Sequence, residues 1–161
     1  MKVARETPEA QRLAWLRDVT RAEASHLAQT DARVFATPFT AETVQTLTED
    51  VALGERVDAF VARLSRLQDG VADKLLPALL RGLAEPVGPT IDNLIRAERL
   101  GWLASADDWL TCRRLRNRLV HEYVKDAQLL ADALNSAHAA VPLLLATADT
   151  LAGEVDRRLA N

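Results

Sequence analysis

The sequence predicts an all-α fold, an antiparallel up-and-down helical bundle of about five helices with an extra N-terminal helix. Signals for strands are almost absent, since no segment sustains an alternation of apolar and polar residues and no Asn-Gly or Asp-Gly turn joins two strand-like runs. Alanine, leucine, arginine and glutamate dominate the composition, and all four favour helices. The segments between the predicted helices are short, which favours antiparallel neighbours.

The size and composition indicate one folded domain. At 161 residues we expect a single helical domain over residues 1–161, and hydrophobic residues at 48% exclude a disordered chain. No apolar run approaches about 18 residues and the N-terminus has no apolar stretch, so we expect no membrane span and no secretory signal. The single cysteine, Cys112, excludes an internal disulfide and a cysteine-based zinc site, and it predicts a cytoplasmic protein.

The first half of the chain predicts two long helices and a shorter one. Thr7-Pro8-Glu9 indicates a helix start, and residues 1–36 are expected to add this helix to the flank of the bundle. From residue 40 to 67, apolar residues recur at spacings of three and four, which predicts one amphipathic helix that Gly54 loosens or bends. Asp69-Gly70 indicates a break before a leucine-rich piece, which Pro77 would kink or shorten unless a helix begins there.

The second half predicts three helices separated by clear stop signals. The loop Pro86-Val87-Gly88-Pro89 precedes a short helix, which Thr90 caps and Gly101 ends. Ser105-x-x-Asp108 has the outline of a capping box and opens the next helix. Asp126 is expected to cap the last helix.

Residues 113–123, with the sequence RRLRNRLVHEY, differ in charge from the rest of the chain. Four arginines lie within six residues, although the formal net charge is −3 and the isoelectric point is near 5.6. A lone basic cluster is usually a solvated helix face. Arg113, Arg114 and Arg118 are therefore interpreted as solvated side chains or as contacts to an RNA backbone.

The order of residue types in this segment indicates a possible chemistry. Arg116 and Tyr123 share one face of a helix with about 100° per residue, and Asn117 and His121 share the neighbouring face. Since Arg116 and His121 differ by about 140°, a groove between two helices or two subunits is needed to collect both. His121 can transfer a proton near neutral pH, and Arg116 can bind a phosphate. Asn117 can orient the imidazole or a substrate hydroxyl.

Other catalytic motifs are absent from the sequence. There is no phosphate-binding or dinucleotide-binding glycine loop and no nucleophile elbow. His121-Glu122 begins like the helix of a zinc protease, but Lys125 occupies the second histidine position. RNA supplies its own nucleophile, the 2′-hydroxyl, so the chemistry above needs no metal and no cofactor.

The segment from Arg116 to Tyr123 resembles a known family. It matches R-x-x-x-x-H-x-Y, the signature of HEPN domains and specifically of HepT-like toxins, and Leu100-Gly101-Trp102-Leu103 resembles the run that precedes that motif. The resemblance covers about residues 40–145. It implies an all-α homodimer with the motif at the subunit interface, acting as a metal-independent endoribonuclease toxin of a toxin–antitoxin pair.

The same resemblance implies roles for individual residues. Arg116 and His121 would be catalytic, with Asn117 as the polar residue that follows the arginine. Tyr123 would match the tyrosine that an antitoxin of the minimal nucleotidyltransferase type modifies with AMP. The added negative charge and bulk beside the site would block the entry of RNA.

Two other functions remain open, namely a non-catalytic subunit that binds a nucleotidyltransferase and a plain dimeric helical scaffold. For the single residues, the alternative for Arg116 is a salt bridge to an acid such as Glu122 or Asp108, and the alternative for Tyr123 is a packed interface aromatic residue. His26 and His138 are interpreted as surface or core-edge residues. The tryptophans are interpreted as anchors of the core or of an interface: Trp15, Trp102 and Trp109.

Overall fold

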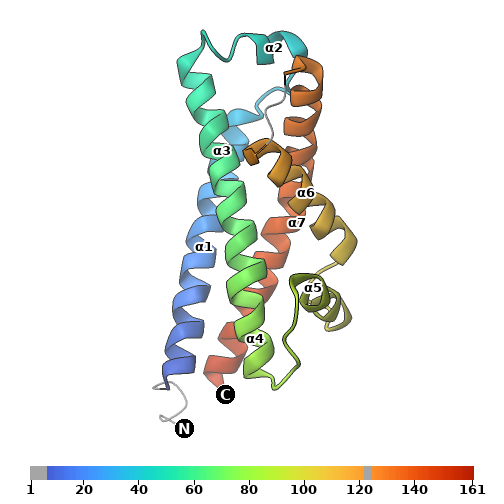
Figure 1. Ribbon diagram of the computed structural model, residues 1–161. Helices are drawn as coiled ribbons and strands as arrows, with labels where there is room; N and C mark the ends of the chain where they lie inside the picture. Colours follow the sequence, from blue (N-terminus) through green and yellow to red (C-terminus); the bar gives the residue numbers. More distant parts are fainter. Residues whose placement is uncertain (1–6, 122–124) are drawn as a thin grey trace.

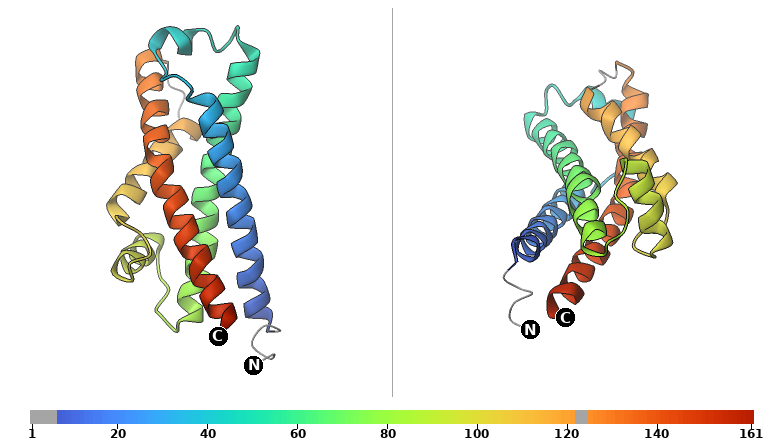
Figure 2. Two further views of the ribbon diagram at one scale, coloured as in Figure 1. Left: turned by 180° about the vertical axis from the view of Figure 1, so that it is seen from behind. Right: turned by 60° about the horizontal axis from the view of Figure 1, so that its bottom comes forward.

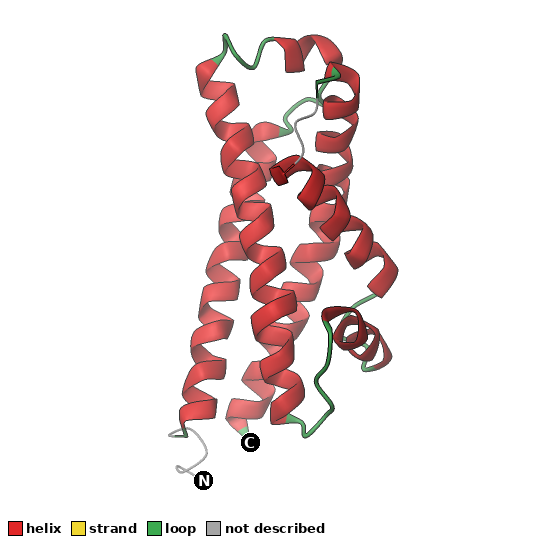
Figure 3. Ribbon diagram, viewed as in Figure 1, coloured by secondary structure: helices red, strands yellow, loops and turns green. Residues whose placement is uncertain are grey.

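The computed structural model describes residues 7–121 and 125–161, and every element in those ranges is helical (Figure 3). In chain order the elements are α1 (Pro8–Val34), α2 (Ala41–Gln45), α3 (Val51–Gly70), the π-helical turn η2 (Val71–Leu75), α4 (Leu76–Gly82), α5 (Thr90–Arg99), α6 (Ala106–His121) and α7 (Ala127–Ala160). Three long helical segments run side by side, namely α1, the run from α3 through η2 to α4, and α7, and shorter helices lie across one end and one flank (Figure 1). The all-α bundle is therefore confirmed.

The helix α1 packs lengthwise against two other long helices, α3 and α7. Its N-cap Thr7 accepts a hydrogen bond from the backbone of Ala10 at 3.1 Å, and its buried face includes Leu13, Leu16 and Leu27. It packs against both α3 and α7, and the view from behind shows α1 and α7 running alongside each other (Figure 2). The helix that lies on the flank is α5, not the N-terminal helix that the sequence placed there.

Residues 40–67 do not form the one continuous helix that the apolar spacing predicts. The chain leaves α2 at Thr46, whose hydroxyl donates to the carbonyl of Thr43 at 2.7 Å. A new helix then begins at Asp50, whose carboxylate accepts from the backbone of Leu53 at 3.1 Å. The side chains of Thr46 and Asp50 thus bind backbone carbonyl and N–H groups that would pair with other backbone groups in a continuous helix. This local capping ends α2 and starts α3.

Gly54 allows a close approach between these two helices. A Cβ atom at this position would lie 3.0 Å from the carbonyl oxygen of Leu47 in the turn before α3. The glycine therefore makes room for the turn, and α3 continues through it without a break.

The predicted break at Asp69-Gly70 is also absent, because α3 continues through η2 into α4. The backbone N–H of Leu76 donates to the carbonyl of Val71, which is the wider spacing of a π-helix. Pro77 follows within the first turn of α4. A proline ring clashes with the carbonyl four residues before it in an ordinary α-helix, and the wider turn relieves this clash.

The stop signals of the second half are mostly confirmed. Gly101 has a φ of 76°, the left-handed conformation that ends α5, and the hydroxyl of Ser105 accepts from the backbone of Asp108 at 3.1 Å. Asp126 caps α7 by accepting from two backbone N–H groups. The cap of α5 differs, since Pro89 takes this position and the hydroxyl of Thr90 donates to Asp73 at 3.3 Å.

The helix α7 has the length and composition to cross a membrane, with a mean hydropathy of 1.4 in its most apolar window. Polar residues interrupt this window, so the sequence shows no unbroken apolar run. Of this window 33% is buried, and α7 contributes Leu134, Leu144 and Leu151 to the core it shares with α1 and α6.

Candidate functional site

The helix that carries the motif, α6, is fixed to the bundle along its inner face. Trp109 is buried and its indole N–H donates to the hydroxyl of Thr147 on α7 at 3.0 Å. One turn later, the buried amide of Gln68 on α3 donates to the sulfur of Cys112 at 2.8 Å and to its carbonyl at 3.3 Å. The two anchors hold α6 obliquely across α3 and α7 (Figure 1). Of the other tryptophans, Trp102 is buried, whereas Trp15 is 56% exposed.

Arg116 lies one turn beyond Cys112 and points into the bundle. The residue is only 9% exposed, and its Nη2 donates to Oδ1 of Asp69 at the end of α3. The sequence predicted a salt bridge as the alternative to a catalytic role, and named Asp108 or Glu122 as partner. The salt bridge exists, but its acid is Asp69, 47 residues away in the sequence.

A second ion pair joins α6 to η2, the turn that follows α3. Both terminal nitrogens of Arg113 donate to the carboxylate of Asp73 on η2, at 3.0 to 3.3 Å. From Asp69 to Asp73 the chain advances by four residues, whereas from Arg116 to Arg113, their respective partners, it goes back by three. Each acid therefore meets one arginine across the junction of two antiparallel helical segments. The sequence pattern marked Asp69 only as part of an expected helix break and gave Asp73 no role.

The junction also holds two buried polar atoms that lack a hydrogen-bond partner among residues 7–121 and 125–161. One is Nε of Arg116, a donor, and the other is Oε1 of Gln68, an acceptor. A buried polar group without a partner costs about 1–3 kcal/mol. The guanidinium of Arg116 is therefore only partly satisfied in this structure.

Cys112 is not a nucleophile in this arrangement. Burial raises the pKa of the Cys112 thiol to about 11, although Gln68 and Arg116 favour its thiolate. The thiol is thus neutral near pH 7, and its sulfur serves as a hydrogen-bond acceptor for α3.

The outward face of α6 carries the remaining polar residues of the motif. Arg114, Asn117 and Arg118 are exposed, and Arg114 donates to the hydroxyl of Thr111 at 3.1 Å. The structure thus divides the residues that the sequence grouped together. Arg116 pairs with an acid of α3 and Arg113 with an acid of η2, while the other three lie on the solvent side.

His121 is the last residue of α6. Its side chain lies outside the described part of the chain, as do the residues from Glu122 to Val124, which include Tyr123. By position on the α6 backbone, Arg116 and His121 are about 140° apart around the helix axis. One copy of α6 does not present these two positions on a single face.

A hollow of about 510 Å³ lies next to the C-terminal end of α6. It is lined mainly by apolar residues of α3, α6 and α7, among them Val57, Leu119 and Leu130. Val120, which also borders it, is 44% exposed. The last turn of α6 therefore lies beside an apolar depression on the surface.

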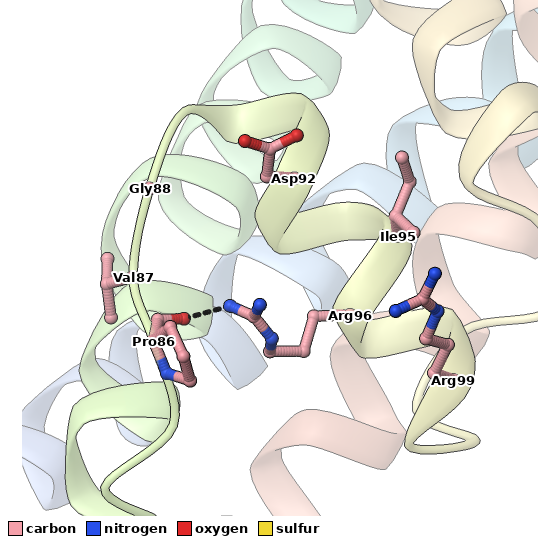
Figure 4. A pocket seen from close by; sticks show the side chains of 7 residues that line it. All are labelled: Pro86, Val87, Gly88, Asp92, Ile95, Arg96 and Arg99. Carbon is pink, nitrogen blue, oxygen red and sulfur yellow. Dashed lines mark hydrogen bonds between the residues drawn. The ribbon is translucent and has the colours of Figure 1, made fainter.

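A separate pocket of about 330 Å³ lies between α5 and the loop before it (Figure 4). The buried Asn93 fixes this loop through two hydrogen bonds to the backbone of Gly88, and Arg96 donates to the carbonyl of Pro86. Arg99 also borders the pocket (Figure 4). This pocket shares no lining residue with α6 and is distinct from the motif.

The two histidines outside the motif have structural surroundings. The ring of His138 stacks on Phe35 at a centroid distance of 4.4 Å and contacts the carboxylate of Asp31 at 2.7 Å. His26 is exposed near the middle of α1. Within the described ranges, no three side chains of His, Cys, Asp or Glu gather where they could ligate a metal ion.

No protein-family model, curated protein or solved structure matches this chain. Its function is therefore inferred from its own residues, and above all from the segment at the end of α6.

Proposed function

We propose that this protein is a metal-independent endoribonuclease of the HEPN type, the toxin of a toxin–antitoxin pair. The observation that supports it best is the sequence from Arg116 to Tyr123, which begins within the last turns of a helix of an all-α bundle. Arg116 is anchored next to an exposed polar face that includes Arg114, Asn117 and Arg118. A basic helix face beside a phosphate-binding arginine fits an RNA substrate.

The proposed reaction uses the 2′-hydroxyl of RNA as nucleophile. His121 exchanges a proton with the reacting oxygens, and Arg116 stabilises the charge that develops on the phosphate. Asn117 orients the imidazole or the hydroxyl. The P–O bond to the 5′-oxygen breaks as the bond to the 2′-oxygen forms, which leaves a 2′,3′-cyclic phosphate and a 5′-hydroxyl end.

The proposal includes a homodimer, because Arg116 and His121 are on different sides of one helix. Two copies of α6 that meet at a shared cleft bring Arg116 of one chain close to His121 of the other. The apolar hollow beside Val120 supports burial of this end of α6 in such an interface. We place the protein in the cytoplasm, which fits its free, buried thiol at Cys112.

The proposed partner is a nucleotidyltransferase antitoxin that transfers AMP from ATP to the hydroxyl of Tyr123 and releases pyrophosphate. Co-expression with such an enzyme should raise the mass of the chain in steps of one AMP, and Tyr123→Phe should remove this increase. An unchanged mass of the wild-type chain would refute the modification and leave the nuclease proposal in place.

The nuclease itself is tested with purified protein, single-stranded RNA and a chelator. We expect cleavage that persists in the chelator, yields cyclic phosphate ends and is lost in His121→Ala and Arg116→Ala. An oligonucleotide of the same sequence with 2′-deoxyribose is the matched control and should stay intact. Cleavage of the DNA, or equal cleavage by the histidine variant, would contradict the mechanism.

A second candidate is a non-catalytic subunit that binds a nucleotidyltransferase. The observation that favours it is the burial of Arg116 in an ion pair with Asp69, which gives this arginine a structural role. This candidate predicts tight binding to the nucleotidyltransferase together with no cleavage of RNA by the wild-type chain.

A further inference from the structure

We infer that Asp69 regulates access to the proposed site, because its carboxylate occupies the guanidinium of Arg116 until an RNA phosphate displaces it. The inference rests on the proposed function, since it takes RNA as the ligand of Arg116. It adds an acid on α3 that competes with the substrate and is not part of the motif.

The relative exposure of the two side chains supports this competition. The side chain of Arg116 is 11% exposed, whereas that of Asp69 is 44% exposed. The acid thus stands nearer the solvent than the arginine it binds. Carboxylates and phosphates bind a guanidinium through the same donors, so a phosphate that approaches Arg116 meets Asp69 as a competitor.

The pair also leaves the arginine incompletely bound. Asp69 receives one hydrogen bond, from Nη2, and the buried Nε of Arg116 has no partner among the described residues. The neighbouring Arg113 uses both terminal nitrogens on Asp73, in three hydrogen bonds. Forked pairs are held more firmly than single ones, so the pair at Arg116 is the one suited to exchange its anion.

Only molecules in which Arg116 is free of Asp69 bind the RNA phosphate. The apparent affinity for RNA is therefore the intrinsic affinity multiplied by the fraction of such molecules. If Arg116 is free in about one molecule in ten, removal of the Asp69 charge tightens RNA binding about tenfold. The change acts through Arg116 and disappears when this arginine is absent.

The test is the affinity of the full chain for a single-stranded 2′-O-methyl RNA oligonucleotide, which cannot be cleaved. Asp69→Asn removes the charge and keeps the shape and an acceptor oxygen. Asp73→Asn is the matched control, because it removes one charge from the same helical run and breaks the other ion pair. Fluorescence anisotropy at one fixed salt concentration measures both.

We expect Asp69→Asn to bind about tenfold more tightly than the wild type, and Asp73→Asn to change the affinity by no more than about twofold. The smaller effect follows because Asp73 binds Arg113, whereas the proposed site takes Arg116 as its phosphate ligand. In the Arg116→Ala background, Asp69→Asn should have no effect. Equal effects of the two variants, weaker binding by Asp69→Asn, or a gain that persists without Arg116 would overturn the inference.

A second measurement needs no substitution at Asp69. In NMR spectra of the wild type, the Nε–H signal of Arg116 should shift when the same oligonucleotide is added, by more than that of Arg113. An Arg116 signal that stays fixed at saturating RNA overturns the inference even where Asp69→Asn fails to fold.

The inference and the proposed function fail in different ways. If Asp69→Asn shows the expected effect but the protein leaves unmodified RNA intact, the competition stands and the nuclease proposal fails. If the protein cleaves RNA and Asp69→Asn has no effect on affinity, the nuclease proposal stands and the competition is refuted. Absence of RNA binding by all variants refutes both.

Discussion

At the scale of single residues, the end of α3 decides how the motif arginine is held. Gln68 anchors Cys112, and Asp69 next to it binds Arg116. One turn further, Asp73 binds Arg113. Three consecutive contacts therefore link α3 and η2 to α6, and they set which donors of Arg116 remain for a ligand.

The thiol of Cys112 should react slowly in the folded protein. Because burial raises its pKa to about 11, the reactive thiolate is scarce at pH 8 and increases only as the pH approaches that value. Labelling with iodoacetamide at pH 8 should be at least about tenfold slower than in denaturant. Equal rates in the two conditions would show that the thiol is neither buried nor held by Gln68.

Glu23 on α1 should make stability depend on pH. Its Oε2 is buried without a hydrogen-bond partner in the described ranges, and a Cβ on Gly70 would lie 3.0 Å from it. Burial raises the pKa of the Glu23 carboxyl, although Arg66 and Lys74 act in the opposite direction. A proton is then held more tightly in the folded chain than in the unfolded chain.

The sign of this effect follows from linkage. The protonated Glu23 carboxyl makes its full contribution to the free energy of unfolding below about pH 4. This contribution is lost as the pH rises through the pKa of the folded state. Glu23→Gln should therefore raise the melting temperature at pH 7 and have a smaller effect at pH 4. A larger gain at pH 4 would contradict the burial of the charged group.

At the scale of elements, capping explains both what the sequence predicts well and what it misses. The N-caps at Thr7 and Asp126 are local signals and could be read directly. The boundary between α2 and α3 was missed because the apolar spacing continues across it, while Asp50 starts a new helix. The absence of a break at Gly70 was missed because the π-helical turn depends on the proline that follows and on the packing around it.

Two glycine substitutions test the packing of the α2–α3 turn. Gly54→Ala should destabilise the protein by about 1–2 kcal/mol, because the new Cβ meets the Leu47 carbonyl oxygen at 3.0 Å. Gly153→Ala is the matched control within α7, where a Cβ meets nothing within 4 Å. It should stabilise by about 0.5–1 kcal/mol, as alanine does in a helix interior. Urea unfolding measures both, and stabilisation by Gly54→Ala would show that the turn does not pack there.

At the scale of the whole molecule, the all-α bundle follows from composition and periodicity, whereas the site depends on tertiary packing. The motif from Arg116 to His121 is visible in the sequence, and its place on a helix was predicted. The acid that binds Arg116 was not, because Asp69 and Arg116 meet only when α3 and α6 pack together. A site shared by two copies of the chain is likewise a property of assembly, and it remains a prediction.

Complementation between two inactive variants tests the central claim most directly. Arg116→Ala and His121→Ala chains are unfolded together, refolded as a mixture and assayed on RNA in chelator beside the wild type. If one chain supplies the guanidinium and the other the imidazole, half of the dimers are mixed and each has one intact site, so about a quarter of the wild-type activity returns. A mixture that stays as inactive as either variant alone, beside an active wild type, would contradict a site shared between two chains.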